Sequence, residues 1–317
     1  MEKLLLLGDE AIARGAIDAG LSGIYAYPGT PSTEIMEYVL TSKEAKEMNI
    51  RSGWAANEKT AMEAALGMSY AGKRSIVCMK HVGLNVAADG FINSAITGAN
   101  GGLIVVAADD PSMHSSQNEQ DSRFYGKFAM VPILEPSNQQ EAYDMMHYGF
   151  DLSEKLEIPV LMRLTTRLAH SRSGVVRKEV RPQNEIKLSG SPNQFILLPA
   201  NARRRFKVLL NNQPLFEKEA EESSFNSYTD GEDHSLGIIT TGIAWNYLNE
   251  NFPDRKIPYP VIKLGQYPLP KKMLTKMYER CDKILVLEDG YPFVEEQLSS
   301  FFGLGKDRWS PAGIPPP

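Results

Sequence analysis

The stretch that decides the fold is residues 57–70, NEKTAMEAALGMSY, which predicts a helix with an acid in its first turn. Asn57 can cap this helix, because its side-chain oxygen can accept a hydrogen bond from a free backbone N–H. Glu58 then lies at the positive end of the helix dipole. Small and apolar residues recur at helical spacing, which predicts one buried face. Spacing alone favours a solvated first-turn acid as the role of Glu58.

Composition limits the classes of protein that this chain can belong to. Its 317 residues, 42% of them hydrophobic, suffice for two domains. The net charge is −5 and the basic residues are scattered, apart from one Arg-rich helix turn, which argues against a nucleic-acid partner. No stretch is long and apolar enough to span a membrane. The two cysteines, Cys78 and Cys281, are far apart, so a reducing, cytoplasmic setting is expected.

Short apolar runs alternate with amphipathic runs on both sides of this helix. The run at 103–108, LIVVAA, is typical of a central parallel strand that is covered on both faces. The alternation predicts an α/β fold with a doubly wound parallel sheet. The expected strands are residues 24–27, 75–79, 103–108, 131–134 and 159–164.

Polar residues follow several of these strands. In open α/β sheets, ligands bind at the carboxyl ends of the strands, so one rim could gather these segments. Turn formation or helix capping explains Thr30 and Ser32 equally well, and a lone histidine such as His170 is more often a packed or surface residue. The polar segments are residues 27–32, 81–85, which contain a glycine turn, 110–123 and 165–170.

The regular alternation fades after the first 180 residues. Prolines and an acidic run suggest that residues 181–234 form a linker with short helices. Residues 235–305 again alternate between strand and helix patterns, which predicts a smaller α/β domain. Residues 306–317 end in a proline-rich sequence and are expected to form a disordered tail.

Several motifs together resemble one family. They are YPGTPS at 27–32, NEK at 57–59, KHVGLN at 80–85, the polar segment 109–120, YPLP at 267–270 and EEQ at 295–297. They resemble the alpha subunit of indolepyruvate:ferredoxin oxidoreductases, which are thiamine-diphosphate-dependent 2-oxoacid:ferredoxin oxidoreductases. The resemblance extends to about residue 305. It implies a pyrimidine-binding domain in residues 1–180 and a transketolase C-terminal-like domain in residues 235–305.

The resemblance also implies parts that this sequence does not contain. In the family, a separate pyrophosphate-binding domain with a Gly-Asp-Gly motif holds the cofactor's diphosphate and Mg²⁺. A cysteine-rich, ferredoxin-like segment holds [4Fe-4S] clusters. The sequence has neither, so we expect a truncated or split subunit. Its expected partners are a beta subunit or separate pyrophosphate-binding domain, a dimer mate, ferredoxin and coenzyme A.

The resemblance places Glu58 against N1′ of the cofactor's aminopyrimidine ring, as the acid that activates it. The expected reaction is oxidative decarboxylation of an aryl pyruvate such as indolepyruvate to an acyl-CoA. The other expected site residues are His81 and Asn85 for the cofactor, and Thr30, Ser32, Gln117, Asn118 and Arg123 for the substrate, with Arg123 as partner of its carboxylate.

Two alternatives remain open from the sequence. One is a regulatory or catalytically incomplete scaffold that only binds partner subunits. The other is a different thiamine enzyme, either a transketolase-like transferase or a decarboxylase. The intact polar rim argues against the scaffold, whereas the missing diphosphate motif argues for it.

Overall fold

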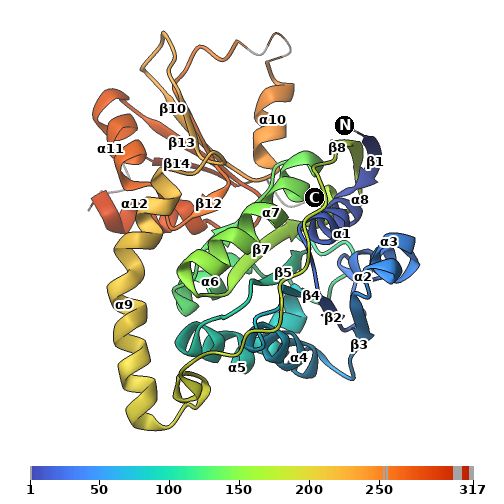
Figure 1. Cartoon of the computed structure of the whole chain (residues 1–317). Coiled ribbons are helices and arrows are strands. Elements are labelled where there is room, and N and C mark those ends of the chain that lie inside the picture. Colours follow the sequence, from blue (N-terminus) through green and yellow to red (C-terminus); the bar gives the residue numbers. More distant parts are fainter. Residues whose placement is uncertain (1, 253, 255, 303–308, 314–317) are drawn as a thin grey trace.

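The computed structural model describes residues 2–252, 254, 256–302 and 309–313. A seven-stranded sheet forms the centre of the larger unit (Figure 1), in the order β12-β6-β7-β5-β4-β2-β3. The six neighbouring strands β6, β7, β5, β4, β2 and β3 run parallel, and the edge strand β12 is antiparallel to β6. The bounds are β2 (Gly23–Ala26), β3 (Arg51–Trp54), β4 (Ser75–Lys80), β5 (Leu103–Asp109), β6 (Ile133–Leu134), β7 (Val160–Thr165) and β12 (Gln266–Tyr267).

Helices cover both faces of this sheet. On one face, α7 lies over Ile104 of β5, because a Cβ added at Gly149 of α7 would lie 2.9 Å from the Ile104 side chain. The helix α1 packs against α7 on the same face. On the other face, the Ser75 hydroxyl donates to the Ala65 carbonyl of α4, which packs against α5. The predicted doubly wound parallel sheet is therefore confirmed. The bounds are α1 (Gly8–Asp18), α2 (Thr33–Thr41), α3 (Lys43–Glu47), α4 (Glu58–Tyr70), α5 (His81–Thr97), α6 (Arg123–Ala129), α7 (Gln139–Leu156) and α8 (Thr166–His170).

The smaller unit has a five-stranded sheet in the order β14-β13-β10-β11-β9. The expected linker holds a 3-10 helix, η1 (Pro192–Phe195), and one 23-residue helix, α9 (Pro199–Glu221), rather than short helices alone. In Figure 1, α9 runs along the side of the larger unit up to the smaller one. The bounds are β9 (Ser227–Thr229), β10 (Gly237–Thr241), β11 (Val261–Leu264), β13 (Ile284–Glu288), β14 (Trp309–Gly313), α10 (Ala244–Glu250), α11 (Lys271–Arg280) and α12 (Phe293–Phe302).

Some elements differ from the sequence expectations. The N-terminal leucine run forms β1 (Lys3–Leu7), which pairs antiparallel with β8 (Arg172–Val176). Within the expected tail, residues 309–313 form β14 beside β13, and residues 306–308 and 314–317 lie outside the described residues. Among the helices that the structure describes, none combines the length and apolar character needed to cross a membrane.

Two fully buried arginines join the smaller unit to the larger one. Arg163, on β7, donates to Asp109 at 2.6 Å and to Glu135 at 2.5 Å, and also to the backbone carbonyl of Asp289 at 2.6 Å. Arg123, at the start of α6, donates to Glu288 at 2.9 Å. We call these arginines, with Asp109, Asp121, Glu135, Tyr267, Glu288 and Asp289, the interface network.

Two glycines of the smaller unit let its loops approach this network. Gly242 has φ +43°, and a Cβ there would lie 2.8 Å from the Glu135 carboxyl group. Gly290 has φ +116°, and a Cβ there would lie 2.8 Å from Arg163 Nη2. Both glycines therefore adopt a left-handed backbone conformation that other residues disfavour. A side chain at either position would also collide with Glu135 or Arg163.

Replacing Arg163 with methionine should destabilise the whole chain. The substitution keeps much of the side-chain volume but leaves Asp109 buried without its cation, while Glu135 keeps Arg123 at 3.6 Å. A broken buried ion pair costs about 3–5 kcal/mol, which should appear as a lower free energy of unfolding in denaturant titrations. Arg280→Met is the matched control, because Arg280 pairs with Asp230 on the exposed surface. Equal stability of Arg163→Met and wild type would contradict a stabilising role for the network.

Candidate active site

The parallel strands of the larger sheet end along one edge. Thr30 follows β2, Glu58 follows β3, His81 follows β4, Asp110 follows β5 and Thr166 follows β7. The register pairs Lys80 with Ala108 and Asp109 with Thr165, so neighbouring strand ends lie at the same level. The structure therefore brings the four polar segments and Glu58 to a single edge.

Glu58 is the first residue of α4. As predicted, Asn57 caps this helix, accepting from the Thr60 N–H at 2.9 Å. Glu58 is half-buried, and its carboxyl group lies against Gly83 on α5, where a Cβ would come within 2.5 Å of Oε1. The described residues give its carboxyl group no hydrogen bond or ion pair. Glu58 thus packs against Gly83 while its polar atoms stay free for a ligand.

Gly83 does not form the turn that the sequence suggested. The helix α5 begins at His81, so residues 81–85 are its first turn. Glycine at position 83 instead leaves room for the Glu58 side chain, which a larger residue there would displace.

His81 and Asn85 have different environments. His81 is 1% exposed, and neither ring nitrogen has a hydrogen-bond partner among the described residues. Burial, followed by the charge of Lys80, lowers the pKa of His81, which keeps the imidazole neutral. Asn85 is exposed and accepts from the Tyr125 hydroxyl at 2.5 Å.

The loop after β2 separates Thr30 from Ser32. The hydroxyl of Ser32 is buried and donates to the Gly29 carbonyl at 2.8 Å, so it shapes the loop. Thr30 remains exposed at the strand edge. The expectation that Ser32 binds substrate is therefore corrected, because its hydroxyl is used inside the loop.

Arg123 also differs from the expectation. It is fully buried, and its guanidinium donates to Asp121 at 2.9 Å and to Glu288 at 2.9 Å. The prediction that Arg123 binds a substrate carboxylate is therefore wrong, because carboxylates of the chain itself already occupy it. Gln117 and Asn118 stay exposed in the loop that leads to Arg123.

The structure adds two residues that the sequence did not single out. Asp110 accepts from the Ser115 N–H at 2.8 Å, from the Ser116 hydroxyl at 2.6 Å and from the Thr166 hydroxyl at 2.7 Å. Burial alone would raise the pKa of Asp110, but these hydrogen bonds lower it to about 2. Lys80 donates to the Ser115 carbonyl at 2.9 Å. An acidic pair directly after the apolar run 103–108 was the available signal for Asp110.

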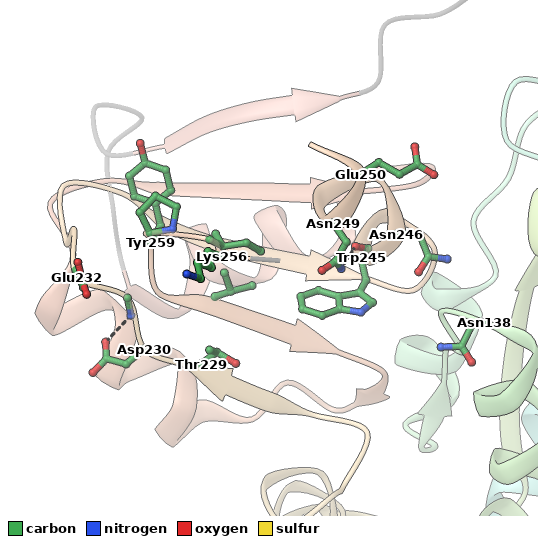
Figure 2. A pocket seen from close by; sticks show the side chains of 14 residues that line it. Asn138, Thr229, Asp230, Glu232, Trp245, Asn246, Asn249, Glu250, Lys256 and Tyr259 are labelled. Atoms are coloured by element: carbon green, nitrogen blue, oxygen red, sulfur yellow. Dashed lines mark hydrogen bonds between the residues drawn. The ribbon is translucent and has the colours of Figure 1, made fainter. Parts of the chain in front are cut away.

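A large hollow lies elsewhere, in the smaller unit (Figure 2), with a volume of about 1100 Å³. Trp245 and Asn249 of α10, Tyr259 and Lys256 line it, and Asn138 comes from the larger unit. Size alone does not make it the reactive site, because the unpartnered Glu58 and His81 lie on the sheet edge of the other unit. We therefore take that edge as the candidate active site.

Comparison with known proteins identifies the family of the chain. The family model "Pyruvate flavodoxin/ferredoxin oxidoreductase, thiamine diP-bdg" matches residues 14–206. The chain belongs to this family. The resemblance seen in the sequence motifs is thus confirmed, and the matched residues include those that carry Glu58, His81 and Asp110.

Curated relatives from this oxidoreductase group are longer than the chain. Indolepyruvate oxidoreductase subunit IorA of Archaeoglobus fulgidus is 44% identical over 300 residues, covering 93% of this chain and 48% of the relative. IorA of Thermococcus kodakarensis is 40% identical over 308 residues, covering 95% of this chain and 47% of the relative. The 2-oxoglutarate synthase subunit KorA of Methanothermobacter thermautotrophicus is 25% identical over 312 residues, covering 94% of this chain and 71% of the relative. The chain spans about half the length of these IorA relatives.

A solved structure supports the fold over nearly the whole chain. The 2-oxoglutarate:ferredoxin oxidoreductase of Magnetococcus marinus superposes with a TM-score of 0.78. The match covers 98% of this chain and 62% of the other, at 20% sequence identity.

The residues at the edge fit one end of thiamine diphosphate. A free carboxyl group beside Gly83 suits a hydrogen bond to a ring nitrogen of the aminopyrimidine. The sequence has no Gly-Asp-Gly motif for the diphosphate and its metal. The chain therefore offers groups for the pyrimidine end of the cofactor.

Replacing Asp110 with alanine should loosen the loop of residues 110–122. Ser115, Ser116 and Thr166 would lose their acceptor, so local opening should become easier by about 1–3 kcal/mol. Hydrogen exchange of this loop at pH 7 should be faster, with β5 unchanged. Because the folded pKa is lowered, the carboxylate stabilises the loop fully above about pH 4, and this stabilisation is lost as the pH falls through about 2. Asp89→Ala, at an exposed position on α5, is the control. Unchanged exchange in Asp110→Ala would rule out Asp110 as the anchor.

Proposed function

We propose that this chain supplies the pyrimidine-binding half of the active site of an indolepyruvate-type 2-oxoacid:ferredoxin oxidoreductase. The reaction is oxidative decarboxylation of an aryl pyruvate to an acyl-CoA, with electrons passed to ferredoxin. The observation that carries the proposal is the unpartnered Glu58 carboxyl group, held against Gly83 in a chain of this family. The names of the IorA relatives support an aryl pyruvate as the substrate.

Glu58 holds a proton at N1′ of the aminopyrimidine ring. When bound, thiamine diphosphate supplies a nucleophilic carbon and an electron sink for decarboxylation. The carboxyl group of Glu58 would donate a hydrogen bond to this ring nitrogen and so support the base chemistry that the bound cofactor supplies. Asn85, oriented by Tyr125, contacts the same cofactor from α5, and His81, kept neutral by burial, lies in the same first turn of that helix.

Thr30 and Lys80 bind the substrate's 2-oxo acid group. Thr30 is exposed on the loop after β2, and Lys80 is a cation at the end of β4. Lys80 lies between that loop and Ser115. A Cβ added at Gly29 would lie 3.2 Å from Lys80 Cβ, and Lys80 donates to the Ser115 carbonyl at 2.9 Å. It therefore takes the carboxylate-binding role once expected of Arg123. Gln117 and Asn118 close over the substrate from the loop anchored by Asp110.

Other domains complete the site. A pyrophosphate-binding domain or beta subunit holds the diphosphate and Mg²⁺, and a ferredoxin-like segment holds the [4Fe-4S] clusters, in a dimeric cytoplasmic assembly. Exposed apolar side chains at and beside the edge support such a cover, because large exposed apolar groups mark interaction surfaces. They are Tyr27, Trp54, Val86 and Met113.

Replacing Glu58 with glutamine should abolish most of the activity of the assembled enzyme. The chain is combined with proteins carrying the pyrophosphate-binding and ferredoxin-like parts, thiamine diphosphate, Mg²⁺, coenzyme A and indolepyruvate, and viologen reduction is followed. The amide cannot transfer the proton, so the rate should fall by about 10²–10⁴-fold. Glu63→Gln, exposed on the same helix, is the control.

Several outcomes would contradict the proposal. Full activity of Glu58→Gln would remove Glu58 from the mechanism. No reduction by the wild-type assembly, with partner binding intact, would favour the scaffold alternative. Faster reduction with 2-oxoglutarate than with indolepyruvate would overturn the substrate assignment. The isolated chain should show no turnover.

Replacing Lys80 with alanine should raise the KM for indolepyruvate by about tenfold or more, since a charge-assisted hydrogen bond contributes about 1.5–3 kcal/mol. The substrate's carboxylate loses its cation in this variant, whereas the cofactor contacts of Glu58 remain. Steady-state kinetics of the assembled enzyme measure the change. Lys73→Ala, just before the opposite end of β4, is the control. An unchanged KM would exclude Lys80 from the substrate site.

A further inference from the structure

Away from the candidate active site, three residues from distant parts of the larger unit's sequence form a cluster of side chains that can bind a metal ion. Asp9 lies in the first turn of α1, Glu34 in the first turn of α2, and His170 at the end of α8. One potential ligand atom from each lies within 4.8 Å of the others. Glu34 Oε1 and His170 Nε2 are 3.6 Å apart.

Close packing of α8 on α1 creates this cluster. A Cβ at Gly8 would lie 2.3 Å from the Leu168 carbonyl oxygen and 3.1 Å from Ala169 Cα. The missing side chain therefore lets the backbone of α8 rest directly on the start of α1. This approach places His170 next to Asp9.

Asp9 is the unusual member of the cluster. It is fully buried, and neither of its carboxyl oxygens has a hydrogen-bond partner among the described residues. Glu34 Oε2 is buried and unpartnered as well. Two facing carboxyl groups of this kind need either a proton or a cation between them.

We propose that Asp9, Glu34 and His170 bind a divalent transition-metal ion such as Zn²⁺. Ligand atoms of a tetrahedral zinc site at about 2.0–2.1 Å from the metal lie about 3.3 Å apart, close to the Glu34–His170 separation. An imidazole ligand favours Zn²⁺ over Mg²⁺ or Ca²⁺. His170 is exposed and Glu34 half-buried, so the ion can reach the cluster from solvent.

The bound ion ties α1, α2 and α8 together. Because Glu34 follows the loop of Thr30 and Ser32, the ion also fixes the helix that starts after that loop. This site is separate from the Mg²⁺ of the proposed thiamine site, and its existence does not depend on the proposed function.

Titration calorimetry of the untagged full chain with ZnCl₂ at pH 7 tests the proposal. Wild type should bind one Zn²⁺, and zinc should raise its unfolding midpoint, since a ligand that binds the folded state stabilises it. Asp9→Asn and His170→Ala should each weaken binding by about tenfold or more. His234→Ala is the matched control, because His234 is an exposed histidine beside an acid, 3.1 Å from Asp230. MgCl₂ should not compete.

The result that overturns the proposal is absence of zinc binding, or binding that survives both substitutions. Should Asp9→Asn fail to fold, His170→Ala decides alone, because its side chain is exposed. Zinc affinity equal to wild type in that variant refutes the site.

Discussion

Arg163 is the constraint on which the site and the junction of the two units both depend. Its single guanidinium binds Asp109 at the end of β5, Glu135 just after β6 and the Asp289 carbonyl of the smaller unit. Because Arg163 itself lies on β7, three neighbouring strand ends are fixed relative to one another. The edge that presents Glu58 and Asp110 is therefore held by the same charges that hold the smaller unit.

The interface network also explains the shape of the loop between β5 and α6. Asp109 fixes the start of this loop through Arg163, and Asp121 fixes its end through Arg123. The network has more carboxyl groups than guanidiniums, and burial raises the pKa of Asp109 to about 6. If either arginine left the interface network to bind a ligand, the carboxylates that it pairs with would remain buried with their charge uncompensated. Only the middle of the loop is free to meet a ligand.

Patterns within the sequence predicted elements whose stability is local or strongly apolar. The runs that form β4, β5 and β7 were predicted because both faces of these strands are buried. The short strands β3, RSGW, and β12, two residues long, were not predicted, because they form only by pairing with a finished sheet. Arg123 was misassigned for a similar reason. In the sequence, an arginine next to a polar loop gives the same pattern whether it faces solvent or is buried. Arg123 is buried against Glu288, which lies 165 residues further along the chain.

Glu58 and Asp9 show what the sequence alone does not distinguish. Both are acids in the first turn of a helix, where the helix dipole favours negative charge by only about 0.3–1 kcal/mol at an exposed site. Asp9 is sealed among other groups, whereas Glu58 is half-buried beside a glycine and open on one side. A proton relay works best where water is excluded, and this chain alone leaves Glu58 in contact with solvent. The exposed Tyr27 and Trp54, at the ends of the neighbouring strands β2 and β3, add apolar surface to the same edge, which is consistent with the cover that the proposed function requires.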